Sequence, residues 1–92
     1  MALRIAGRIV QSSTTVTNTA TSIPSTAVVG RNTMLILNNG SNTVYLGASN
    51  VTTANGYPLS AGEEKAFDLD DAVVLYGVTG SDTSDVRSLE GV

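Results

Sequence analysis

Short apolar or alternating segments, separated by turn-forming residues, limit what this chain can fold into more than any other feature. Such segments span residues 33–38, 43–47, 65–69, 72–78 and 85–90, and residues 14–23 are almost all β-branched or small before Pro24. Strands of about five residues at spacings near ten are typical of an all-β protein, and no stretch has a clear helical period. The pattern predicts one small antiparallel β-sandwich, jelly-roll or Greek-key-like.

Turn chemistry supports the same fold. Asn39-Gly40 between two predicted strands favours a tight hairpin of type I′, since that turn needs positive φ at both central residues. A second Asn-Gly stands at Asn55-Gly56, and Pro58 keeps its neighbourhood at a turn or a sheet edge. Residues 42–64 are therefore predicted to be a strand, a polar loop and a turn into the next strand.

The first thirteen residues differ from the rest, because they hold two arginines and no acid. We expect residues 1–13 to form either an arm that docks on another chain or an extra edge strand, and residues 14–92 to form the sandwich. Arg4 and Arg8 interrupt the apolar residues, so the segment lacks the continuous core of about 7–15 apolar residues that a secretory signal has. Synthesis in the cytoplasm, without a membrane span, is expected.

The side-chain inventory argues against catalysis. The chain has no Cys and no His, which excludes a thiol nucleophile and the commonest general base and metal ligand. A net charge of −3 argues against nucleic-acid binding, which needs clustered Lys and Arg side chains. The acidic runs 67–71 and 81–85 could hold Ca²⁺, but a full ligand loop is missing and turns are the favoured interpretation. No enzyme activity, cofactor, metal or nucleic acid is expected.

Two of the predicted strands, at 34–37 and 73–76, are apolar on both faces. A strand with one face in water should alternate, so something is expected to cover the second face. The cover could be a loop or the N-terminal segment, but a subunit interface is favoured. We therefore expect a homo-oligomer, with a trimer as the favoured closed form. Tyr57, between Gly56 and Pro58, is either an interface contact or a cover for a sheet end.

The residues from about 23 to 90 also carry a family resemblance. The relevant motifs are Gly30-Arg31 before an apolar strand, "VYLG" at 44–47, "VT" and "NG" at 51–56, "AGE" at 61–63, "LYG" at 75–77 and "VRSLE" at 86–90. This pattern is similar to that of small virion proteins of tailed bacteriophages, which include capsid decoration proteins and parts of head fibres and tails. The resemblance implies a β-sandwich with a structural role in the virion.

From the residues and the resemblance together, we expect a capsid decoration protein that binds the major capsid protein on the outside of the assembled shell. The predicted contact residues are Arg4, Ile5, Arg8, Ile9 and Val10, with Arg31 and Tyr57 as further candidates. One alternative is a tail, baseplate or head-fibre subunit. Another is a carbohydrate- or receptor-binding module that uses the loop at 50–57.

Overall fold

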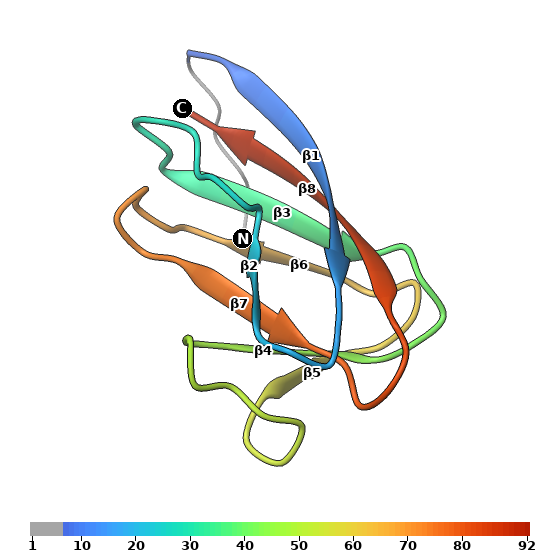
Figure 1. Ribbon diagram of the computed structural model, residues 1–92. Helices are drawn as coiled ribbons and strands as arrows, with labels where there is room; N and C mark the ends of the chain where they lie inside the picture. The colour runs from blue at the N-terminus through green and yellow to red at the C-terminus, as the bar shows by residue number, and fades with distance from the viewer. Residues whose placement is uncertain (1–6) are drawn as a thin grey trace.

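Eight strands form the described part of the chain, which is residues 7–92 of a computed structural model (Figure 1). Sheet A has the order β1-β8-β3-β6 and sheet B the order β2-β7-β4-β5, with every pair antiparallel. The strands are β1 (Ile9–Val16), β2 (Thr21–Ile23), β3 (Thr33–Asn38), β4 (Val44–Gly47), β5 (Tyr57–Leu59), β6 (Glu64–Phe67), β7 (Leu75–Val78) and β8 (Ser84–Gly91). The predicted small all-β sandwich is confirmed. Within residues 7–92, no helix is long and apolar enough to cross a membrane.

The topology is that of a jelly roll. Strands pair first with last, as β1 with β8, β2 with β7, β3 with β6 and β4 with β5, and these pairs alternate between the two sheets. The pairs β8–β3 and β7–β4 then join them into sheets of four. Because consecutive strands up to β4 lie in alternate sheets, the ends of β3 and β8 become the places where loops from both sheets meet.

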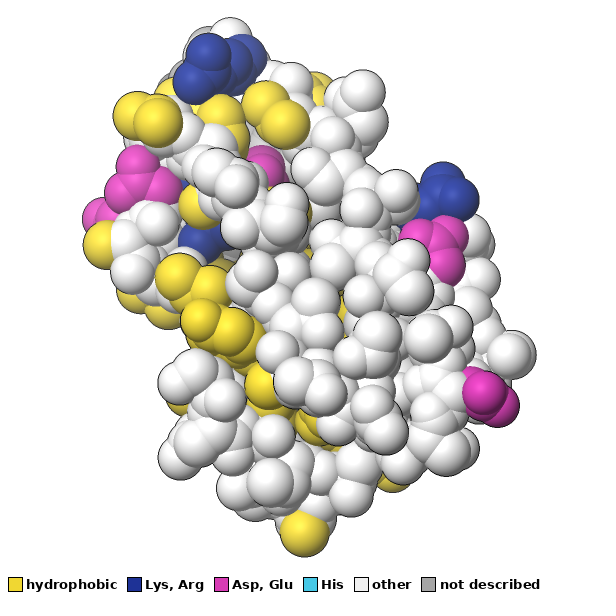
Figure 2. Space-filling view, in the orientation of Figure 1, with side chains coloured by type: hydrophobic (Ala, Val, Ile, Leu, Met, Phe, Trp, Pro, Cys, Tyr) yellow, Lys and Arg dark blue, Asp and Glu magenta, His cyan; other side chains and the backbone are white. Residues whose placement is uncertain are grey.

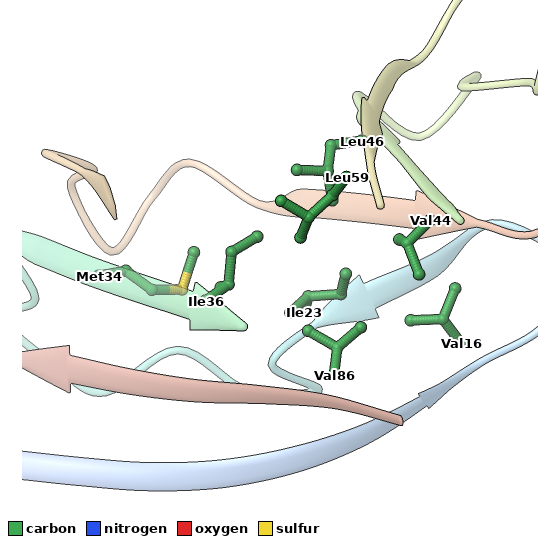
Figure 3. Close-up of a cluster of buried hydrophobic side chains, with 8 residues drawn as sticks. All are labelled: Val16, Ile23, Met34, Ile36, Val44, Leu46, Leu59 and Val86. Carbon is green, nitrogen blue, oxygen red and sulfur yellow. The ribbon is translucent and has the colours of Figure 1, made fainter. Parts of the chain in front are cut away.

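The core lies between the sheets and is made of eight buried hydrophobic side chains (Figure 3). Val16, Met34, Ile36 and Val86 come from sheet A, and Ile23, Val44, Leu46 and Leu59 come from sheet B. Each fully buried side chain of this kind stabilises the fold by about 1.5–3 kcal/mol through removal from water. The two sheets therefore contribute equal numbers of side chains to one small core.

Gly77 of β7 leaves room for core side chains of the two neighbouring strands of sheet B, β2 and β4. A Cβ atom at this position would lie 2.7 Å from Cδ1 of Ile23 and 2.9 Å from Cγ1 of Val44. Both neighbours are held in the packed interior, so neither can move aside without leaving its contacts. The "LYG" motif at 75–77 thus contains a packing requirement.

The outer face of sheet A explains one of the two runs that are apolar on both faces. Met34 and Ile36 point into the core, while Leu35 and Leu37 lie on the outer face and are only half-buried. Together with Leu89 of β8 they line a shallow depression of about 620 Å³. No other strand of residues 7–92 covers this face.

The prediction of a hairpin at Asn39-Gly40 is wrong. Strand β3 belongs to sheet A and strand β4 to sheet B, so this segment crosses between the sheets instead of reversing within one. Only Gly30 and Gly62 have positive φ within residues 7–92, and a type I′ turn would need it at Asn39 and Gly40. The local turn signal was overridden by the burial of Asn38 at the end of β3.

The segment at 14–23, which is almost all β-branched or small, is divided between two strands. Strand β1 ends at Val16 and strand β2 begins at Thr21 in the other sheet. Between them, the Thr17 hydroxyl accepts a hydrogen bond from the Thr19 backbone N–H at 3.1 Å, which is a local side-chain turn. Residues 9–13, which the sequence assigned to an arm or an extra strand, form the first part of β1 at the edge of sheet A.

Candidate partner-binding surface

A buried ion pair ties two loops to one end of the sandwich. Arg31 lies in the β2–β3 loop and Glu90 lies in β8, 59 residues later, and Nη1 of Arg31 donates to Oε2 of Glu90 at 2.9 Å. The two side chains are 1% and 0% exposed. A buried charge is stable only when it is paired and its remaining polar atoms are hydrogen-bonded. The other donors of Arg31 and the carboxylate of Glu90 therefore need further hydrogen-bond partners.

The remaining contacts of this pair come from loop backbone. Nε of Arg31 donates to the Leu69 carbonyl at 3.2 Å, and Nη2 donates to the carbonyls of Asp70 and Val73. The same Oε2 atom of Glu90 accepts a hydrogen bond from the Val28 N–H at 3.1 Å. The pair therefore holds residues 28–31 and residues 69–73 against the end of β8.

Two aspartates add hydrogen bonds to these loops, Asp71 between them and Asp70 within its own loop. Gly30, with φ of +82°, directs its N–H at Oδ2 of Asp71, 2.6 Å away. Asp70 accepts a hydrogen bond from the Ala72 N–H at 2.9 Å, and this bond lowers the pKa of the Asp70 carboxyl. The acidic run at 67–71 thus serves loop structure, and within residues 7–92 no three acidic side chains are grouped to hold a metal ion.

Above this buried support the loops expose three valines. Val29 is 79% exposed, and Val73 and Val74 are 49% and 47% exposed. Figure 2 shows hydrophobic side chains gathered on the side where the β2–β3 and β6–β7 loops lie, with acidic and basic side chains interspersed among them. Exposed apolar side chains held on a fixed backbone are typical of a surface that meets another molecule.

A groove continues this surface along the open side of the sandwich. Tyr57, Phe67 and Leu75 line a cavity of about 310 Å³ together with Leu46, Gly47 and Lys65. Leu75, which lines the groove, follows Val73 and Val74 directly in the chain. We call this whole surface the apolar band, formed by Val29, Phe67, Tyr57, Leu75, Val73 and Val74.

Some of the contact residues predicted from sequence lie at this surface and others do not. Arg8 and Ile9 are exposed at the same end, and Nη2 of Arg8 lies 3.4 Å from the Val29 carbonyl. Tyr57 is 57% exposed at the far end of the band, with Nζ of Lys65 5.2 Å from its ring centroid. Arg4 and Ile5 lie outside the described residues.

The other two predicted contact residues are less accessible. Val10 is half-buried in β1 opposite Glu90. Arg31 is 3% exposed and spends its donors on its own chain, so it holds the loops and does not present a charge to a partner. Sequence reasoning missed Val29, because an isolated valine before Gly-Arg carries no periodic signal.

The opposite ends of β3 and β8 carry a second buried polar cluster. Nδ2 of Asn38 donates to the carbonyls of Asn42 and Leu59 at 2.8 and 2.9 Å. Its Oδ1 accepts from the Gly40 N–H at 3.1 Å and from the Ser84 hydroxyl at 2.6 Å. This amide is fully buried and fully satisfied, and it fixes the loops at this end as Arg31 does at the other.

Comparisons of the chain with protein-family models, with curated proteins and with solved structures find no match. The surface itself therefore carries the functional argument. It offers apolar contact on a rigid support, flanked by a few charges, and this arrangement suits binding to another macromolecule.

Proposed function

We propose that this chain is a structural protein of a tailed-phage particle, and more narrowly a capsid decoration protein that binds the outside of the assembled shell. The family resemblance of residues 23–90 supports the class. The observation that carries the proposal is the apolar band, in which Val29, Val73 and Val74 are exposed on loops fixed by a buried ion pair. The partner would be the major capsid protein, and the chain would reside on the virion surface after synthesis in the host cytoplasm.

The proposed mechanism is binding without chemistry. Contact with the shell would bury the valines of the band, each worth up to about 1.5–3 kcal/mol when fully removed from water. Arg8 beside Val29 would pair with a carboxylate of the shell, a contact that salt weakens while it stays exposed. Repetition over many equivalent sites would strengthen a lattice that is already assembled.

Two related functions use the same surface. A tail, baseplate or head-fibre subunit would bury the band against a neighbouring subunit in place of the shell. A carbohydrate-binding module would use the groove beside Tyr57, where an exposed aromatic ring lies next to Lys65.

Self-association, with the trimer expected from sequence, would use a different surface. This is the outer face of sheet A, with Leu35, Leu37 and Leu89.

The experiment begins with particles purified from the source phage. Antibody raised against the chain should label the heads, and cryo-electron microscopy should place the density on the outer surface of the shell. Labelling confined to tails would favour the tail or fibre alternative. Absence of the chain from purified particles, together with binding on a glycan array that a Tyr57→Ala variant loses, would replace the proposal with the carbohydrate-binding function.

A further inference from the structure

The four edge strands of the two sheets are protected very differently. Strands at a sheet edge expose unpaired N–H and C=O groups, and proteins guard them by shortness, charge or proline. Strand β2 has three residues, β5 has three including Pro58, and β6 has four including Glu64 and Lys65. Each of these three edges therefore resists pairing with another chain.

Strand β1 has none of these protections. It runs for eight residues, Ile9–Val16, with no charged residue and no proline. All eight residues pair with β8 in an unbroken register, and no other segment of residues 7–92 pairs with its free edge. Figure 1 shows β1 along the margin of sheet A. A long and uncharged edge is the arrangement that most readily accepts a further strand.

The register identifies which backbone groups are free. The Asn39 N–H donates to the Asp85 carbonyl at 2.8 Å, so the odd-numbered residues of β8 bond to β3. Alternate residues of an antiparallel strand bond to opposite neighbours, and the Val92 N–H donates to the Arg8 carbonyl in agreement. The even-numbered residues of β1 thus bond to β8. Its odd-numbered residues, Ile9, Gln11, Ser13 and Thr15, direct their N–H and C=O groups outward.

We propose that this edge pairs with β1 of a second copy of the chain, antiparallel about a two-fold axis at Ser12. In this register Ile9 faces Thr15 of the second copy and Gln11 faces its Ser13. All four outward-facing residues then form hydrogen-bonded pairs in both directions, which gives about eight backbone hydrogen bonds. Sheet A becomes one continuous sheet of eight strands, and this proposal does not depend on the capsid role proposed above.

Charge and symmetry favour a second copy as the occupant. Two copies with a net charge of −3 repel each other over most of their surface, but β1 is uncharged and sets no like charges opposite each other. A two-fold axis uses the same patch twice, so the assembly closes instead of growing into a fibre. Gln11 and Ser13 also border the depression on the outer face of sheet A, which the pairing would double in length. A two-fold pair competes with the trimer expected from the apolar runs.

Sedimentation and residue-resolved hydrogen exchange of the full chain test the pairing together. We expect the mass to double as concentration rises. The amides of Gln11, Ser13 and Thr15 should then slow, while those of Ser12 and Thr14, already bonded to β8, should keep the same protection at all concentrations. A monomer at every concentration would overturn the proposal. So would a trimer, or a dimer in which the odd-numbered amides still exchange freely.

Variants separate pairing from folding. Ser13→Pro removes one outward N–H, which an edge strand tolerates, and should abolish the dimer. Ser13→Ala keeps that N–H and should leave the dimer intact. The double variant Gln11→Lys with Ser13→Lys sets ammonium groups opposite each other and should give a folded monomer, with unfolding temperature checked by circular dichroism. A folded dimer of either disrupting variant would refute the pairing.

Discussion

Arg31 and Glu90 lie buried at one end of strands β3 and β8, and Asn38 and Ser84 lie buried at the other. Both clusters bond to loop backbone and fix the loops around them. At the Asn38 end those loops, residues 39–43 and 79–83, consist of small polar residues. At the Arg31 end they expose Val29, Val73 and Val74.

The comparison of the two ends separates the buried polar clusters, which the fold needs, from the exposed valines, which it does not need. Both ends show that a buried polar cluster is enough to fix a loop, whatever side chains the loop exposes. None of the strongly exposed large hydrophobic side chains of residues 7–92 lies in the loops of the Asn38 end. The three valines are therefore not required to close the sandwich, and their exposure supports the proposed contact with another molecule.

The largest effect is expected from breaking the ion pair. Arg31→Met leaves Glu90 buried without its cation and leaves the carbonyls of residues 69, 70 and 73 without a donor. The free energy of unfolding should fall by about 3–5 kcal/mol. Urea unfolding followed by circular dichroism measures this. A loss below about 1 kcal/mol would show that the pair is not what ties the loop end.

A smaller loss is expected from the Asn38 cluster, which is uncharged. Asn38→Ala removes the partner of two buried carbonyls and of the Ser84 hydroxyl. Stability should fall by about 1–3 kcal/mol. Asn50→Ala, at an exposed amide in the β4–β5 loop, serves as the matched control. Equal losses for Asn38→Ala and Arg31→Met would contradict the distinction between a charged and a neutral cluster.

Removing the exposed valines should hardly change stability. The double variant Val73→Ser with Val74→Ser replaces side chains that are about half exposed and leaves the Val73 carbonyl free to accept from Arg31. Surface changes of this kind usually stay within about 0.5 kcal/mol each. A midpoint of urea unfolding that falls as far as that of Asn38→Ala would show that the valines belong to the core.

The smallest expected effect is on acid stability, with one aspartate at each end. The Ala72 N–H lowers the pKa of Asp70, and the Asn39 amide, followed by Arg87, lowers the pKa of Asp85. Each carboxylate stabilises the fold above the ordinary aspartate pKa of about 3.9, and loses that contribution as pH falls through its lowered value. Asp85→Asn should therefore lose less stability than the wild type between neutral pH and the acid range. An acid unfolding transition of Asp85→Asn that matches those of the wild type and of the Glu64→Gln control would contradict this.

The sequence was sufficient for the fold class and several strands. Residues 33–38 are strand β3 as predicted, and the segments at 43–47 and 85–90 match β4 and β8 within one residue at each end. Residues 43–47 and 85–90 were predictable because one face of each strand is buried, which leaves a pattern of period two, and residues 33–38 because they are a short apolar run of strand length. The exchange of sheets at 17–20 and at 39–43 was not predictable, since it depends on which strands pair first with last across the whole chain.

The surface was harder to predict than the fold. Gly30-Arg31 and "VRSLE" both stood out in the sequence, but their meeting in one buried ion pair requires the β3–β8 register. Without it, Arg31 had the appearance of a surface contact. The exposure of Val73 and Val74 similarly depends on the loop leaving sheet A before β7 begins at Leu75. Long-range pairing, which local patterns do not encode, decided both outcomes.

Binding of the valine variant to shells tests the central claim most directly. Undecorated shells of the source phage are mixed with the wild type, with the Val73→Ser and Val74→Ser double variant, and with an Ala61→Ser and Thr83→Ser control from exposed positions elsewhere. The account predicts that the wild type and the control pellet with the shells, while the folded valine variant stays in the supernatant. Equal pelleting of all three proteins would contradict the assignment of the apolar band as the attachment surface.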